Sequence, residues 1–207
     1  APITAIALNC ENNRDERSRY LLVENRKVEN YVDMALYYAR MDAVYKDYMI
    51  AETNLQEVAQ QVLLQNKYYL IQSHVKAEVA CPDTVYSDKK WIAFILNQLI
   101  QNSVKYGRSE GTHIQIVTKK TKSGVLLRVK DDGIGIPKEE IPRIFEKGFT
   151  GTNGRNRERS TGMGLYLCRK LCDKLNIEIR AESAEGKGTE IILMFPVSDY
   201  LTGYRET

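Results

Sequence analysis

Apolar residues near the start of the chain recur at helical spacing. Ile3, Ala7 and Cys10 are separated by four and then three positions, which predicts a short helix over residues 2–10. The polar stretch 12–15 interrupts this pattern and predicts the end of that helix. Because the pattern is already regular at the first residues, we expect the helix to begin upstream and the sequence to be a fragment of a longer protein.

A second, longer helix is expected over residues 16–42. Its apolar seam alternates steps of four and three, as in a helical bundle, and consists of Val28, Val32, Ala35 and Ala39. Two such helices cannot bury both of their faces alone. We therefore predict that this hairpin, residues 1–45, forms a homodimer in which a second copy completes a four-helix bundle.

From residue 46 onward the pattern mixes helices and strands, which predicts one further domain, 46–207. Helices are expected over residues 55–66, 89–106 and 162–175. Strands are expected over residues 47–53, 77–80, 85–87, 113–119, 124–131, 177–183 and 189–195. This order predicts an α+β fold, a two-layer sandwich with helices packed on one face of a sheet.

Composition excludes several function classes. The 207 residues include 30 basic and 27 acidic side chains, and the net charge of +3 gives no general reason to expect nucleic acid as a partner. The four cysteines lack the paired spacing of a zinc site, and Cys168 and Cys172 are expected to be small buried residues. No apolar run approaches the roughly 20 residues of a membrane span.

Four separate segments could hold a nucleotide, and the first lies on the predicted helix 89–106. Gln98, Asn102 and Lys105 are spaced by four and three residues, so they project from one face. The amide oxygen of Asn102 is a ligand that Mg²⁺ accepts, and Lys105 adds positive charge for phosphates. Alone, this spacing is more typical of a solvated helix face.

The second segment runs from Asp131 to Pro137 and directly follows a predicted strand. Gly133 and Gly135 let the backbone approach a flat ligand closely. The carboxylate at the strand end can accept a hydrogen bond from an exocyclic amine, such as that of adenine. Alone, such a segment is more often a plain turn.

The third segment, residues 144–161, contains no strongly apolar residue after position 149. It carries three alternating arginines, Arg155, Arg157 and Arg159. Such a stretch cannot join a core, so we expect a lid that an anion orders, with a solvated surface loop as the alternative. Gly162 and Gly164 then open an apolar helix, whose exposed N–H groups favour phosphate.

The fourth segment, residues 186–189, is a Gly-Lys-Gly-Thr turn that as a hairpin needs no function.

Taken together and in this order, the segments resemble the N box, first glycine box, F box, second glycine box and closing GxGT turn of the histidine-kinase branch of the GHKL ATPase superfamily. The resemblance covers about residues 47–197. It implies a Bergerat-type ATP fold with ATP and Mg²⁺ as cofactors. The implied nucleotide-binding set is Gln98, Asn102, Lys105, Tyr106, Asp131, Gly133, Gly135, Ile136, Arg143, Phe145, Lys147, Gly162, Met163, Gly164, Leu165 and Thr189.

The resemblance also implies a role for several members of this set. Asp131 would receive the adenine amine, Asn102 would ligate Mg²⁺, and Lys105 would lie near the phosphates. Tyr106 would lie beside the adenine and Phe145 would anchor the base of the lid, while Arg143 and Lys147 would contact phosphates. The N box usually opens with asparagine where this chain has Gln98. Glutamine adds a methylene, so its contact would run through water.

The first four residues, Ala-Pro-Ile-Thr, resemble the end of a histidine-kinase H box, whose phosphoacceptor histidine would lie upstream of this chain. His74 and His113, the two histidines present, lack that context and are expected to have a surface or structural role. Residues 35–40 resemble the bacitracin-sensor, intramembrane-sensing class of Gram-positive kinases. That class implies the cytoplasmic portion of a cell-membrane protein that works beside a peptide-antibiotic ABC transporter.

The implied activity is that of a sensor histidine kinase in a two-component system. The γ-phosphoryl group of Mg-ATP would pass to a histidine and then to an aspartate of the cognate response regulator. Because the acceptor is missing, we expect no self-phosphorylation. Two alternatives stay open: a GHKL-type ATPase of the gyrase or Hsp90 kind, in which a glutamate at the position of Gln98 activates water, and a non-catalytic dimerisation module.

Overall fold

The computed structural model describes residues 6, 16–40, 48–152 and 161–197. The expected helix over residues 2–10 lies outside this set apart from Ile6, which is helical and exposed. The three arginines of the expected lid also lie outside the described residues, and so does the segment around the expected domain boundary at residue 45. That boundary stays a prediction.

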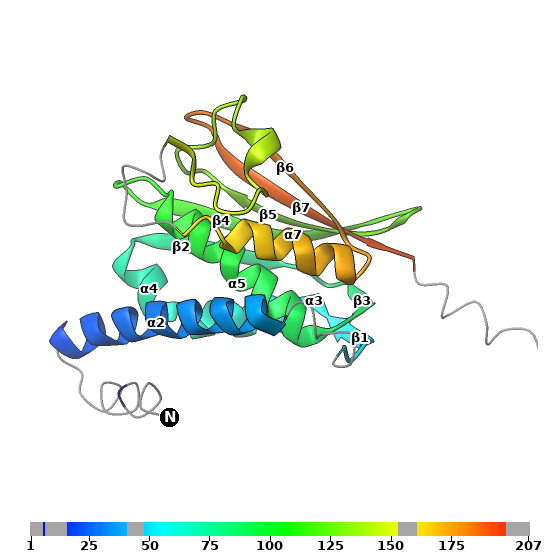
Figure 1. Ribbon diagram of the computed structural model, residues 1–207, viewed down its shortest axis with the longest axis horizontal. Coiled ribbons are helices and arrows are strands. Elements are labelled where there is room, and N and C mark those ends of the chain that lie inside the picture. The colour runs from blue at the N-terminus through cyan, green and yellow to red at the C-terminus, as the bar shows by residue number, and fades with distance from the viewer. Residues whose placement is uncertain (1–5, 7–15, 41–47, 153–160, 198–207) are drawn as a thin grey trace, which may run out of the picture.

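Five α-helices, one 3-10 helix and seven strands make up the described part of the chain (Figure 1). The helices are α2 (Glu16–Arg40), α3 (Leu55–Gln65), α4 (Lys67–Gln72), α5 (Lys89–Lys105), η2 (Ile141–Arg143) and α7 (Gly164–Lys174). The strands are β1 (Ala51–Asn54), β2 (Val75–Ala80), β3 (Thr84–Ser87), β4 (Thr112–Thr121), β5 (Gly124–Asp131), β6 (Glu178–Ala184) and β7 (Gly188–Pro196).

The main sheet has five strands in the order β2-β4-β5-β7-β6. Strands β2 and β4 are parallel, and the other neighbours are antiparallel. Inward-facing side chains such as Ile114, Leu127 and Leu193 are fully buried against the helices, which lie on one face of the sheet (Figure 1). The predicted α+β sandwich is therefore confirmed.

Helix α5 forms the centre of the helical layer. Its residues Ile92, Ile95, Leu96, Leu99 and Ile100 are almost completely buried, which is more than one face of a surface helix would show. The helix contacts α3 and α7 on its flanks and β4 and β5 beneath it. This position explains why its polar residues can lie next to the ends of the strands.

Two parts of the fold differ from the sequence expectation. Residues 48–50 are not in a strand: β1 begins at Ala51 because its partner β3 is only four residues long. Helix α4 was not expected. Leu70 is its one buried residue, so its six residues carry no apolar period that a sequence pattern could reveal.

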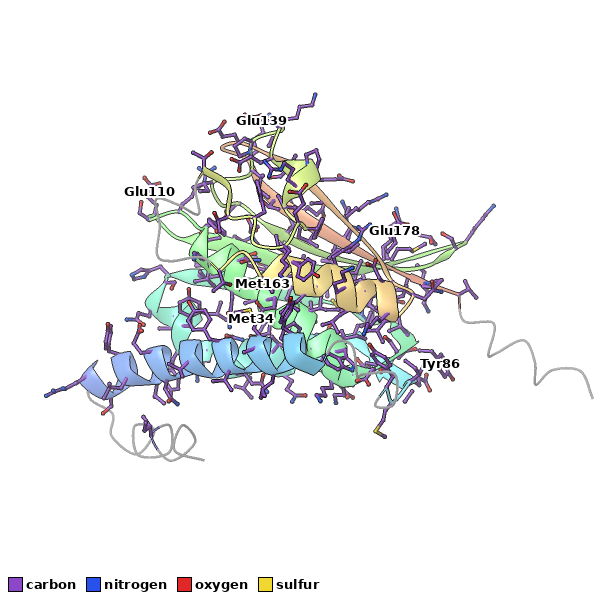
Figure 2. The ribbon with its side chains drawn as sticks, viewed as in Figure 1. Met34, Tyr86, Glu110, Glu139, Met163 and Glu178 are labelled. Atoms are coloured by element: carbon purple, nitrogen blue, oxygen red, sulfur yellow. The ribbon has the colours of Figure 1, made fainter. Side chains whose placement is uncertain are left out.

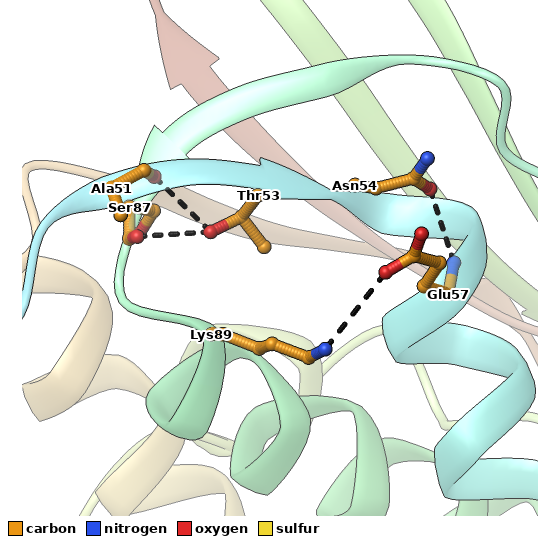
Figure 3. Close-up of polar contacts among 6 residues, drawn as sticks. All are labelled: Ala51, Thr53, Asn54, Glu57, Ser87 and Lys89. Atoms are coloured by element: carbon orange, nitrogen blue, oxygen red, sulfur yellow. Dashed lines mark hydrogen bonds and ion pairs between the residues drawn. The ribbon is translucent and has the colours of Figure 1, made fainter.

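The small β1–β3 sheet leads into helix α3 (Figure 3). Thr53 Oγ1 donates to the carbonyl of Ser87 at 3.0 Å, which links the two strands through a buried side chain. Asn54 caps α3 by accepting from the Glu57 N–H at 3.1 Å. The short sheet is thereby tied to the main core, because α3 buries its apolar face there.

Helix α2 lies beside α4 and α7, farther from the sheet (Figure 1). Its Met34 packs against the core and lies on the side of α2 that faces the other helices (Figure 2). Two residues of the expected seam, Val28 and Val32, are 48% and 42% exposed. The seam is thus available to a further helix, and its use in a dimer stays a prediction. Within the described residues, no helix combines the length and hydropathy needed to cross a membrane.

The start of α5 yields a test of the fold. Buried Asp88 accepts from the N–H groups of Lys90 and Met49, at 2.9 and 2.8 Å, and so joins the α5 cap to the segment before β1. We expect Asp88→Ala to lower the free energy of unfolding by about 1–3 kcal/mol, since a cap is lost and the buried N–H of Trp91, which also donates to Asp88 at 3.4 Å, is left without this acceptor. Urea denaturation measures this loss. Asp88→Asn keeps a capping oxygen and should lose less; an Asp88→Ala protein as stable as the parent would contradict the assignment.

Candidate functional site

Asp131, the last residue of β5, connects three of the four segments that the sequence singled out. Its Oδ2 accepts a hydrogen bond from Ser103 Oγ on α5 at 2.9 Å. Its Oδ1 accepts from the backbone N–H groups of Gly133, at 3.0 Å, and Thr189, at 3.2 Å. The predicted convergence of Asp131, Gly133 and Thr189 is therefore present in the structure, with Ser103 as an additional member.

The electrostatic state of this carboxylate follows from its surroundings. Burial raises the pKa of Asp131, and the hydrogen bonds from Ser103, Gly133 and Thr189 oppose that effect. Desolvation is the larger cause, so the ionised carboxylate still lacks part of the hydration it would have in water. A ligand that brings another hydrogen-bond donor, such as an exocyclic amine, would complete its surroundings.

Close backbone contacts explain the two glycines that follow Asp131. A Cβ at Gly133 would lie 2.6 Å from the carbonyl oxygen of Tyr106. Gly135 has φ +70, and a Cβ there would lie 2.0 Å from the carbonyl oxygen of Ala184. In between, Ile134 N donates to the Tyr106 carbonyl at 3.0 Å. Any larger residue would push this segment away from α5 and from the β6–β7 turn.

Ser183 links two further members of the expected set. Its hydroxyl accepts from Ile136 N at 2.9 Å and lies 3.0 Å from Thr189 Oγ1. Neither Ser183 nor Ser103 was found by sequence reasoning. Ser103 lies directly after Asn102, inside the N-box segment, and a hydroxyl there was the only available signal; Ser183 lies in an ordinary strand pattern and offered none.

Gln98 of α5 lies against the start of α7. Its side chain is buried, and a Cβ added at Gly164 would lie 2.8 Å from its Oε1. Its Nε2 has no hydrogen-bond partner among the described residues. Met163 and Leu165 flank Gly164, and Figure 2 marks Met163 at the start of α7. The Gln98 side chain thus packs against the N-terminus of α7 with its Oε1 nearest Gly164, and the backbone N–H groups of that N-terminus favour an anion.

Asn102, Lys105 and Tyr106 are half-buried at the C-terminal end of α5. Asn102 directly precedes Ser103, whose hydroxyl donates to Asp131 at the end of β5. Lys105 Nζ lies 5.9 Å from the centre of the Tyr106 ring. No group of three or more His, Cys, Asp or Glu residues in the described ranges could hold a metal ion. A magnesium ion at Asn102 would therefore take most of its ligands from phosphate and water.

The residues of the expected F box contact protein side chains other than those around Asp131. Phe145 packs against the core, with the Arg169 guanidinium 5.9 Å from its ring centre. Arg143 pairs with Glu146 at 3.1 Å. Lys147 donates to the hydroxyl of Tyr38 on α2 and lies 4.6 Å from its ring centre.

Arg143 and Lys147 are exposed, so they pair with the nearest acidic or aromatic side chain rather than with the residues around Asp131. Gly162 lies at the other end of the expected lid, where its carbonyl accepts from Gly148 N at 3.0 Å. The two ends of that segment therefore meet.

The cysteines and the histidines were expected to have no chemical role, and their surroundings agree with that expectation. Cys168 and Cys172 are fully buried in α7, and burial raises the pKa of Cys172 to about 12, so its thiol stays protonated at neutral pH. His113 Nε2 lies 3.2 Å from Glu78 Oε1 across the β2–β4 pair. His74 ends the turn before β2 with φ 53.

Comparison with known families gives one match. The family described as histidine kinase-, DNA gyrase B-, and HSP90-like ATPase matches residues 87–199. This range begins just before α5 and extends past β7, so it includes Asp131, Asn102 and both glycine segments.

Curated relatives extend the similarity toward the N-terminus. Sensor histidine kinase YxdK of Bacillus subtilis is 32% identical over 196 residues, which cover 94% of this chain and 60% of that protein. Sensor protein kinase GraS of Staphylococcus aureus is 35% identical over 204 residues, or 96% of this chain and 58% of that protein. The chain thus spans about 60% of the length of these relatives.

Solved structures share the fold. The catalytic domain of histidine kinase ThkA superposes with a TM-score of 0.62 at 26% identity and covers 72% of this chain and 97% of that domain. The Acinetobacter baumannii histidine kinase AdeS superposes with a TM-score of 0.67 at 20% identity and covers 96% of both chains. At that lower identity the likeness concerns the fold alone.

The partly buried carboxylate of Asp131, which would bind a ligand, is expected to lower the stability of the folded chain. A raised pKa means that the folded chain binds the Asp131 proton more tightly than the unfolded chain does, so ionisation costs stability as the pH rises through the folded pKa. Asp131→Asn removes this charge and keeps an oxygen for Gly133 and Thr189. We expect it to raise the Tm at neutral pH by about 2–4 °C for each kcal/mol of desolvation relieved.

Thermal unfolding followed by circular dichroism across a pH series measures this difference, which should shrink as the pH is lowered and Asp131 becomes protonated in the parent. Asp173→Asn, which neutralises an exposed carboxylate, is the control and should bring no gain. A Tm of Asp131→Asn below that of the parent at neutral pH would show that the carboxylate stabilises the fold.

Proposed function

Since this chain belongs to the family of histidine kinase-, DNA gyrase B- and HSP90-like ATPases, we propose that it is the kinase portion of a sensor histidine kinase. It binds ATP with Mg²⁺ and transfers the γ-phosphoryl group to a histidine. The observation that carries this proposal is the hydrogen-bonded convergence of α5, the first glycine segment and the β6–β7 turn on Asp131. Such a convergence supplies a base-recognition site beside an amide-bearing helix.

Different residues of the proposed site contact different parts of the nucleotide. Asp131 accepts from the adenine amine, and the half-buried Tyr106 lies beside the base. Asn102 and Lys105 face the phosphates from the end of α5. The N-terminus of α7 at Gly164, against which Gln98 packs, offers backbone N–H groups to phosphate oxygens. These donors fit a Mg-triphosphate, in which the metal neutralises charge that develops on the phosphoryl oxygens.

The reaction needs little covalent chemistry from the protein. A histidine imidazole nitrogen attacks the γ-phosphorus, a nitrogen–phosphorus bond forms, and the bond to the ADP oxygen breaks. Positioning and charge neutralisation supply most of the rate in phosphoryl transfer. Amides, a lysine and helix N–H groups are sufficient for that task, and no nucleophile of this domain is required.

The whole protein is proposed to act as its relatives' names suggest, in a two-component system. The exposed seam of α2 is the dimer surface, and the cognate response regulator takes the phosphoryl group from the histidine onto an aspartate. The protein would be anchored in the cell membrane with this portion in the cytoplasm. A peptide-antibiotic ABC transporter is its proposed neighbour, which rests on the sequence resemblance of residues 35–40 alone.

Gln98 argues against the hydrolase alternative. Water activation in that class needs a carboxylate at this position, and an amide cannot accept the proton. The side chain is also only 5% exposed, which limits access for water. A non-catalytic module would have no reason to retain the buried Asp131 charge, because the uncompensated desolvation of that charge opposes folding.

Nucleotide binding gives the first test. We expect the parent to bind a non-hydrolysable ATP analogue with Mg²⁺, and Asn102→Ala to weaken the Mg²⁺-dependent part of this binding by roughly tenfold or more, because a metal ligand is lost. Calorimetric titration with and without Mg²⁺ measures both values. Gln101→Ala, one position away on α5, is the matched control and should bind as the parent does. Equal Mg²⁺ dependence in the parent and Asn102→Ala would remove Asn102 from the metal site.

Phosphoryl transfer gives the second test. With radiolabelled ATP, we expect the chain itself to stay unlabelled, because neither His74 nor His113 lies in the sequence context of a phosphoacceptor histidine. A separate helical hairpin that carries the family's acceptor histidine should become labelled in trans, and the same hairpin with that histidine replaced by glutamine should not. Label on this chain would contradict the assignment, and steady phosphate release that depends on Gln98 would favour the hydrolase class.

A further inference from the structure

Arg108 makes hydrogen bonds that have no role in the activity proposed above. It follows α5 by a few residues and is exposed. Its backbone N–H donates to Thr112 Oγ1 at 2.8 Å, which fixes the start of the side chain. Its Nε donates to the carbonyl of Asp132 at 2.8 Å, and its Nη2 donates to the carbonyl of Gly186. One guanidinium group thus joins two loops that are far apart in the sequence.

These two loops hold the Asp131 carboxylate. Asp132 immediately precedes Gly133, and Gly186 lies in the turn that leads to Thr189. Gly133 and Thr189 are the residues whose N–H groups donate to Asp131 Oδ1. The loops also contact each other, since Gly186 N donates to the Ile134 carbonyl at 2.7 Å. Arg108 therefore lies across the outer side of the loop pair that orients the carboxylate.

The carboxylate has little freedom left. A carboxylate offers about four acceptor positions. Three are occupied in the structure, by the N–H groups of Gly133 and Thr189 on Oδ1 and by the Ser103 hydroxyl on Oδ2. The remaining position is on Oδ2, and its direction depends on where the two loops hold Oδ1.

We propose that Arg108 is a positioning residue that sets the discrimination for adenine by clamping the two loops around Asp131. The proposal rests on the proposed function, because it assigns a determinant of base specificity to the same site. A planar guanidinium presents its five N–H donors in fixed geometry, so two of them can hold two carbonyl groups at a set separation. Arg108 does not contact the base itself and acts through Asp131.

The test compares two nucleotides that differ by the group Asp131 receives. ADP carries the 6-amino group of adenine, and the diphosphate of purine riboside lacks it. In the presence of Mg²⁺, the parent should bind ADP about tenfold or more tightly than the purine riboside diphosphate, as expected for a hydrogen bond to a charged acceptor. In Arg108→Ala this ratio should fall to within about threefold, through weaker ADP binding alone. Isothermal titration calorimetry gives both Kd values.

Three further proteins separate positioning from other effects. Arg108→Lys keeps the positive charge but not the two-donor fork, so its ratio should lie between those of Arg108→Ala and the parent; a ratio equal to that of the parent would overturn the geometric argument. Arg180→Ala removes an exposed arginine of β6 that pairs with Glu182 at 3.8 Å, and its ratio should be unchanged. Asp131→Asn should show a low ratio whether or not Arg108 is present.

The possible failures are distinguishable. If Arg108→Ala binds both nucleotides more weakly by the same factor, Arg108 supports the fold of the site in general and the proposal is wrong. If the parent binds and discriminates but Arg108→Ala keeps the full ratio, the proposal is wrong and the proposed function stands. If the parent binds neither nucleotide, the proposed function fails and this inference fails with it. The Tm of each variant shows that the protein compared is folded.

Discussion

The requirement that a buried carboxylate be supplied with hydrogen-bond donors governs the architecture of this site. Asp131 lies at the end of a central strand, where burial opposes its ionised form. Its donors come from a helix, a glycine loop and the start of strand β7, all of which must reach the same point. A change that moves any of the three elements leaves the charge less well compensated, so the site and the local fold are energetically coupled.

The sheet fixes the positions of the carboxylate and its donors relative to one another. Asp131 and Thr189 are direct partners in the β5–β7 register, so the ladder itself brings the Thr189 N–H to the carboxylate. The loop after Asp131 lies between the end of α5 and the β6–β7 turn, where the close approach of Gly135 to Ala184 leaves no room for a side chain. Function in this domain thus depends on backbone positions that the central strands determine.

Helix α5 serves two purposes that compete for the same surface. Its apolar residues form the centre of the core, and its polar residues line the site at one edge. Gln98 loses a hydrogen bond in this arrangement, because its buried amide nitrogen has no partner in the described part of the chain. Its side chain is only 5% exposed, so this unpaired nitrogen lowers the stability that the core helix provides.

The sequence by itself determined the elements with strong periodicity, the α+β class, and the three segments that meet at Asp131, because apolar spacing and glycines are local signals. It did not reveal α4, whose six residues have one buried side chain, or the late start of β1, which the length of β3 sets. Only the tertiary structure revealed the contacts that Ser103, Ser183 and Arg108 make with these segments. Their roles depend on which carbonyl or carboxylate lies opposite them, and strand register and loop packing decide that pairing.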